Sequence, residues 1–197
     1  MRINTIRLRA TIGWLGMLLP WIVVFLIGYI PKSISATWYT NACTVFMIIL
    51  GSASFLLISY KGYERRDDIL LTCSGISGLG ICLFPCASSV PGEKIGTFLI
   101  ESNVSDILHC IFAVVFFALL AYNSLFLFTK GEKQMCQRKK ARNIIFRVCG
   151  IGIIASCLIL FIPIPCRIWV METVALFFFG VSFLTKANIY PWLFCDK

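Results

Sequence analysis

Residues 21–27 read WIVVFLI, a run that is apolar on every side, within the longer stretch TIGWLGMLLPWIVVFLIGYIP at 11–31. A membrane-spanning helix needs about 20 mostly apolar residues, because about 30 Å of hydrocarbon is covered at about 1.5 Å per residue. A β-barrel strand would instead alternate apolar and polar residues over about ten positions. Residues 11–31 therefore predict a transmembrane helix.

The same pattern recurs along the chain. Six apolar stretches are long enough to span a membrane, at about 11–31, 41–60, 69–89, 105–129, 143–165 and 168–187. The links between them are too short for a soluble domain, and the longest, at about 90–104, has room for an ordered loop or a partial helix. We therefore expect an all-α fold: one integral membrane domain over residues 1–197, built as a polytopic bundle of six transmembrane helices.

The composition agrees with a membrane protein. Hydrophobic residues make up 59% of the chain and charged residues 14%, against about 45–50% and about 25% in average globular proteins. This balance excludes a secreted disulfide-rich domain, a disordered tail and a conventional soluble enzyme.

The net charge of +9 is distributed unevenly over the predicted links. Fifteen of the 18 basic residues lie before helix one, in the 61–68 link, between Lys130 and Arg147, or at the C-terminal end from Lys186 on. Because basic residues gather on the cytoplasmic side of membrane proteins, both termini are predicted to be cytoplasmic. The charge is thus an orientation signal rather than a nucleic-acid site, and we expect a multi-pass protein of a bacterial inner (plasma) membrane.

The first 36 residues also have features of a signal peptide. They combine a basic start, an apolar run and the small residues Ser33, Ser35 and Ala36. The apolar run is longer than the about 7–15 residues of a signal core, which favours an uncleaved first helix. The alternative is cleavage after residue 35, and the intact mass of the purified protein distinguishes the two.

Ten cysteines and one histidine carry no metal signature. No Cys-x-x-Cys pair occurs, and a second histidine for zinc or haem is absent, so we predict neither a metal site nor a cofactor. Four cysteines lie near the predicted outer helix ends, namely Cys43, Cys86, Cys110 and Cys166. We interpret them as small apolar side chains, with a disulfide among them as the alternative.

Three ionisable residues near the predicted outer ends of helices four and six matter most, because a charge inside the membrane costs about 3 kcal/mol even on the lenient insertion scale. Asp106 and His109 are three residues apart on helix four, so they share a face. Glu172 lies about one turn into helix six from the same outer side. The connection after helix one adds Ser35, Tyr39 and Asn41 on that side. These six residues are our candidate outward-facing binding pocket.

Three interpretations of this cluster remain open. In the structural one, Asp106 caps helix four with Ser102 or Ser105, and the carboxylate and imidazole pair with Arg167 or Lys94. In the second, the pocket binds a lipid headgroup or another membrane protein. In the third, His109 oriented by Asp106 acts as a base for Ser35 or Ser105 in a membrane-embedded hydrolase or transferase acting on a lipid headgroup. No Gly-x-Ser-x-Gly elbow supports that chemistry, so enzymatic activity is left uncertain, more in favour of none. A small transporter would need a polar path past Asn123.

On the cytoplasmic side, the link between helices two and three is aromatic and of mixed charge. Its candidate residues are Lys61, Tyr63, Arg65 and Asp67. They suit contact with anionic lipid headgroups, with a solvated hairpin as the alternative. The predicted partner is therefore the lipid bilayer itself, and the oligomeric state is left open.

Several segments resemble the uncharacterised bacterial six-helix membrane family known as domain of unknown function 998. They are Ser33–Ala36, Tyr39–Asn41, Tyr60–Asp67, Gly80–Pro85, His109-x-x-Phe112, Tyr122–Lys130 and Glu172–Ser182. The resemblance covers about residues 30 to 187 and implies a six-helix integral membrane protein, with no established activity to carry over.

The order of these features also resembles, more distantly, the damage-regulated autophagy modulator and Frag/Sfk membrane proteins. Those proteins share six helices, an outer Ile-Ser segment after helix one and a histidine on helix four. That resemblance implies a role connected with lipids.

Overall fold

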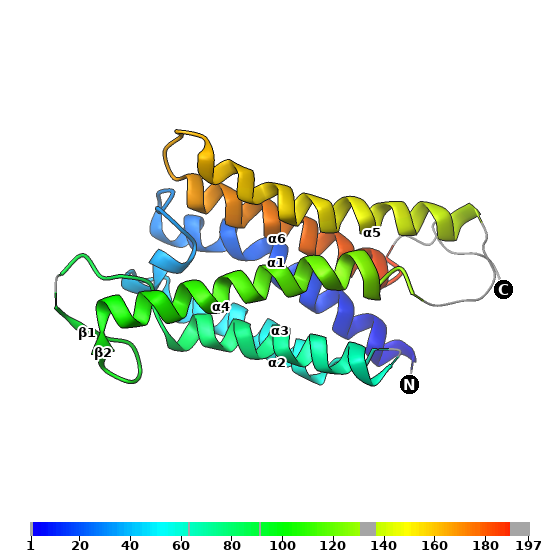
Figure 1. Cartoon of the computed structure of the whole chain (residues 1–197), viewed down its shortest axis with the longest axis horizontal. Coiled ribbons are helices and arrows are strands. Elements are labelled where there is room, and N and C mark those ends of the chain that lie inside the picture. Colours follow the sequence, from blue (N-terminus) through cyan, green and yellow to red (C-terminus); the bar gives the residue numbers. More distant parts are fainter. Residues whose placement is uncertain (1, 63, 91, 131–136, 190–197) are drawn as a thin grey trace.

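The computed structural model describes residues 2–62, 64–90, 92–130 and 137–189 (Figure 1). Six long α-helices make up most of this part of the chain. They are α1 (Arg2–Ile27), α2 (Cys43–Ser59), α3 (Arg65–Leu83), α4 (Ser102–Tyr122), α5 (Gln137–Ser156) and α6 (Arg167–Lys186). Each of the six predicted stretches corresponds to one helix, so the all-α prediction is confirmed.

Short elements occupy the links and the helix ends. They are the 3₁₀-helix η1 (Ser35–Tyr39), the strands β1 (Lys94–Ile95) and β2 (Ile100–Glu101), the π-helix η2 (Asn123–Leu127) and the 3₁₀-helix η3 (Cys157–Phe161). The two strands pair antiparallel, with Lys94 opposite Glu101. This hairpin and the first turn of α4 occupy most of the 90–104 link.

The helices form a closed ring. Each packs against its neighbours in sequence, and α6 packs against α1 to close it. Figure 1 shows the helices running along the long axis, with the hairpin beyond one end. We call this the hairpin end; it carries segments 28–42, 84–101 and 162–166. The opposite end, where α1 begins and α6 ends, is called the basic end.

Helix α1 differs from its predicted range. It starts at Arg2 rather than near residue 11 and ends at Ile27 rather than near residue 31. The early end is caused by Gly28, whose φ of +80° is the left-handed conformation that terminates helices. Its N–H donates to the Val24 carbonyl at 2.9 Å. The remaining residues of the predicted stretch belong to the link.

Helix α3 was predicted at about 69–89 and runs instead from Arg65 to Leu83. Its first turn contains Asp67 and Asp68, whose negative charge suits the positive end of the helix dipole. Its last residue lies just before Phe84, which precedes Pro85 and so disfavours helical backbone. The hydropathy of a window does not register either effect, which explains the shift toward the N-terminus.

The other helices also shift at their ends. Helix α2 lies within its predicted 41–60 range, and α6 agrees to one residue at each end. Helix α4 starts three residues early and continues as η2, and α5 starts six residues early and continues as η3.

Four helical segments among the described residues are long and apolar enough to cross a membrane: Thr5–Ile27, Ser102–Leu127, Gln137–Phe161 and Arg167–Lys186. Helix α2 is apolar but has only 17 residues. Helix α3 carries four charged residues in its first turn. The chain therefore has the helices of a membrane protein, with four spans clear from length and composition.

Candidate functional site

One face of α4 fastens the segment that follows α3. Ser102, Ser105, Asp106 and His109 are spaced i, i+3, i+4 and i+7, so they form one stripe at the hairpin end. Each side chain bonds the backbone of residues 84–88, which we call segment 84–88. Two carbonyls accept hydrogen bonds of 2.7 Å: that of Phe84 from His109 Nδ1, and that of Pro85 from Ser105 Oγ. Two backbone N–H groups donate hydrogen bonds of 2.9 Å: that of Ala87 to Asp106 Oδ1, and that of Ser88 to Ser102 Oγ.

These contacts change the structural interpretation of Asp106 and His109. The N-cap residue of α4 is Glu101, and no side chain caps that helix end. Within the described residues, neither Asp106 nor His109 forms a salt bridge with Arg167 or Lys94. The predicted cap and ion pairs are therefore wrong, because unpaired backbone groups of segment 84–88 lie closer and need partners.

The orientation of the His109 ring follows from its partner. A carbonyl oxygen only accepts hydrogen bonds, so the contact with Phe84 assigns a proton to Nδ1. Ser105 is fully buried and donates its proton to Pro85. Among the described contacts, the candidate base His109 and the candidate nucleophile Ser105 therefore bond two different backbone carbonyls.

Tyr39, the last residue of η1, contacts the same segment. Its hydroxyl donates to the Cys86 carbonyl at 2.5 Å. Burial, followed by the charges of Cys86, Glu93 and Asp106, raises the pKa of Tyr39 to about 12. The hydroxyl therefore stays protonated near neutral pH and keeps donating.

The thiol of Cys86 lies among the acidic groups of the hairpin end. Burial raises its pKa to about 12, with further contributions from the charges of Asp106 and Glu172. A thiol with so high a pKa is mostly protonated and a poor nucleophile near neutral pH. All eight described cysteines are free, Cys86, Cys43, Cys110 and Cys166 included.

Glu172 lies apart from the α4 stripe and holds a different segment. One oxygen, Oε2, accepts a hydrogen bond of 2.6 Å from the backbone N–H of Ile34, which directly precedes η1. The residue is 9% exposed. Its other oxygen, Oε1, has no hydrogen-bond partner among the described residues. The carboxyl group therefore fixes the start of η1 with one oxygen and leaves the second available.

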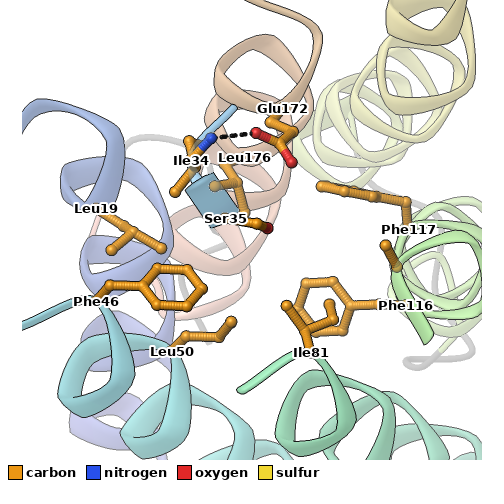
Figure 2. Close-up of a pocket in the computed structure, with 11 residues that line it drawn as sticks. Leu19, Ile34, Ser35, Phe46, Leu50, Ile81, Phe116, Phe117, Glu172 and Leu176 are labelled. Carbon is orange, nitrogen blue, oxygen red and sulfur yellow. Dashed lines mark hydrogen bonds between the residues drawn. The ribbon is translucent and has the colours of Figure 1, made fainter. Parts of the chain in front are cut away.

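Glu172 and Ser35 line a cavity near the axis of the ring. Figure 2 shows the second Glu172 oxygen and the Ser35 hydroxyl turned toward the space between the helices. The remaining lining is apolar: Leu19, Ile34, Phe46, Leu50, Ile81, Ala113, Phe116, Phe117 and Leu176. The volume for the centres of water-sized molecules is about 30 Å³, and the whole hollow with its open part has about 350 Å³. Because about 10–15 Å³ by the first measure admits one water, a small ligand group fits.

The six residues of the predicted pocket therefore divide into separate sets. Ser35 and Glu172 line the cavity, whereas Tyr39, Asp106 and His109 hold segment 84–88 beside it. Asn41 belongs to neither set, since its amide donates to the Leu26 carbonyl at the end of α1 over 3.4 Å.

Sequence reasoning missed the aromatic lining of the cavity. Phe46, Phe116 and Phe117 come from α2 and α4, and all three point into the hollow in Figure 2. Nothing in the sequence separates these rings from the many other phenylalanines of the predicted helices. Only the way in which the helices pack around the cavity identifies these three phenylalanines.

The candidate loop at the basic end is held by an ion pair. Asp67 is 1% exposed and accepts from Lys130 Nζ at 2.8 Å, with Glu64 at 3.4 Å from the same nitrogen. The hydrogen bond with Asp67 is the largest cause that raises the pKa of Lys130. Lys61 and Arg65 are exposed beside this pair, and Tyr63 lies outside the described residues. Asp67 is thus a structural residue, while the two basic side chains face outward.

Two further observations bear on other site types. Among the described residues no group of three or more His, Cys, Asp or Glu is arranged to hold a metal ion. Asn123 is fully buried and donates to Ser74 Oγ at 3.1 Å, which joins α3 to the end of α4.

Comparison of the chain with models of known protein families, with curated proteins and with solved structures finds no match. The site must therefore be interpreted from its own geometry.

Proposed function

We propose that this chain is a multi-pass protein of a bacterial inner membrane that binds a lipid-class ligand in the cavity beside Glu172 and Ser35. In this proposal all six helices cross the bilayer, both termini are cytoplasmic, and the hairpin end faces outward. The resemblance to the domain of unknown function 998 family belongs to the same proposal.

The exposed side chains support six spans. Every helix presents a large apolar residue outward: Phe25, Phe55, Ile76, Val114, Ile151 and Phe177 are each at least half exposed. Apolar surface on all sides of a molecule suits hydrocarbon rather than water. Helices α2 and α3 also lie between α1 and α4 in the ring, so they share the environment of their neighbours.

The cavity supports ligand binding through one observation above all. A buried acidic side chain turns an unpaired oxygen into a hollow that is otherwise lined by hydrocarbon and by Ser35. This oxygen borders the hollow, so a ligand group that enters the hollow can pair with it. A ligand with an apolar chain and a polar end would satisfy both parts of this site, and the Glu172 carboxyl would recognise the polar end.

The test is native mass spectrometry of the full chain purified in mild non-ionic detergent. We expect the wild type to carry a lipid-sized bound mass. Ala113→Leu fills the cavity from α4 without touching Glu172, and it should abolish that mass. Ala118→Leu makes the same change on the exposed side of α4 and should leave the mass unchanged. A bound mass of equal abundance in both variants would exclude the cavity as the site.

A further inference from the structure

Resting on the proposed function, we infer that the polar end recognised in the cavity is an alkylammonium group. The ligand class would be a cationic amphiphile whose ammonium group lies between Glu172 and the aromatic rings of the cavity.

The charge balance of the site carries the first step. Among the described residues Glu172 has no salt-bridge partner, and it receives one hydrogen bond, from Ile34. A carboxyl group in apolar surroundings stays ionised only where a cation or several donors offset its lost hydration, and otherwise it takes up a proton. The chain supplies one donor, so the cavity is complementary to a positively charged ligand group.

The aromatic lining carries the second step. Phe46, Phe116 and Phe117 surround the space that the free carboxylate oxygen faces (Figure 2). The face of an aromatic ring attracts a cation, and cages of such rings bind ammonium groups. An anionic phosphate would meet the Glu172 carboxylate, which repels it, and the cavity lining offers no basic side chain to offset that repulsion. These side chains therefore select ammonium over phosphate.

The size of the cavity and the Ser35 hydroxyl suit a primary ammonium group. The cavity has about 30 Å³ for the centres of water-sized molecules, which is room for about two waters or for an ammonium group with its first methylene. Ser35 Oγ has no hydrogen-bond partner among the described residues and lies on the same cavity wall. It accepts a second N–H of a primary ammonium, while the open part of the hollow takes the alkyl chain.

The experiment compares three probes of one chain length on the full protein in non-ionic detergent, by native mass spectrometry. Decylammonium, decanol and decanoate differ only in the charge and hydrogen bonding of the head. We expect a one-to-one complex with decylammonium and at least about tenfold weaker binding of the other two, because only the ammonium pairs with Glu172.

Three variants sharpen the comparison. Glu172→Gln keeps an acceptor for Ile34 N–H and removes the charge, so it should reduce the preference for decylammonium over decanol by about tenfold or more. Phe116→Leu should lower decylammonium binding more than decanol binding. Glu101→Gln removes an exposed carboxylate at the same end of the molecule and should change neither. Thermal unfolding of each variant verifies that it folds.

The two proposals fail in distinguishable ways. The ammonium inference would be overturned if decanol and decylammonium bound equally, if Ala113→Leu abolished this binding and if Glu172→Gln left it unchanged. The cavity would then remain a lipid site. Stronger binding of decanoate would overturn the ammonium inference as well. No binding of any probe, together with the lack of a co-purified lipid, would overturn both proposals.

Discussion

At the scale of single residues, the hairpin end is organised by side chains that bond backbone. Four polar residues of α4 and Tyr39 all hold segment 84–88, and Glu172 holds the start of η1. Each removes the cost of a backbone group that no helix satisfies. Polar residues at the ends of the helices thus fix the link segments around the cavity.

Tyr39 gives this arrangement a pH dependence. Its pKa is raised from 10.0 to about 12, so its contribution to stability is complete below pH 10 and is lost as the pH rises toward 12. We expect Tyr39→Phe to lower the stability by about 0.5–1 kcal/mol near neutral pH, the value of one hydrogen bond. Unfolding of both proteins in detergent across this alkaline range should show the difference shrinking. A difference that stays constant to the highest pH would contradict the role of Tyr39 as a titrating donor.

The sequence identified these residues but not their partners. The spacing of Asp106 and His109 placed both on one face of α4, which the structure confirms. Their acceptors and donors are backbone groups of segment 84–88, and every residue type carries such groups. The sequence therefore does not show which backbone groups these side chains bond. The aromatic lining of the cavity was missed for a related reason, since these side chains are hydrocarbon in a chain that is mostly hydrocarbon.

At the scale of elements, hydropathy located all six helices and misplaced several ends. The ends depend on individual residues: Gly28 ends α1 through its positive φ, and Pro85 follows the end of α3. A short charged turn also begins α3 earlier than its apolar part does. Local backbone preferences therefore set the boundaries, whereas the apolar length sets the number of helices.

The closing contact of the ring makes a further prediction. Helices α1 and α6 approach closely at Gly180, where an added Cβ would lie 2.8 Å from the Gly13 carbonyl oxygen and 2.9 Å from Met17 Cβ. Small residues allow such approaches between membrane helices. We expect Gly180→Leu to destabilise the protein by about 1–3 kcal/mol through overpacking, measured as a lower midpoint of thermal unfolding in detergent by circular dichroism.

Gly51 provides the matched control for this prediction. It lies within α2, and an added Cβ there meets nothing within 4 Å. Both substitutions gain the same helix propensity, so that effect cancels in the comparison. Equal stability of Gly180→Leu and Gly51→Leu would show that the α1–α6 contact does not limit the packing of the ring.

At the scale of the whole molecule, the proposed orientation rests on where the charge lies. Arg9, Lys61, Arg65 and Lys130 all belong to the basic end, where α1 begins, α2 gives way to α3, and α4 ends. The hairpin end instead carries the polar contacts around the cavity. A protein inserted by the positive-inside rule would therefore present the cavity outward and the basic end to the cytoplasm.

Epitope tags at three positions test this topology and the number of spans together. With six spans, a tag after Lys61 and one at the C-terminus should react with antibody only after the inner membrane is permeabilised. A tag after Gly92, beside the hairpin, should react in intact spheroplasts. If α2 and α3 stayed outside the bilayer and four helices crossed it, the Gly92 and C-terminal tags would each react as they do with six spans. The Lys61 tag would then react in intact spheroplasts. The Lys61 tag alone separates these two topologies, because only the link between α2 and α3 changes sides between them. Inverted labelling of all three tags would contradict the orientation itself and would turn the proposed ligand cavity toward the cytoplasm.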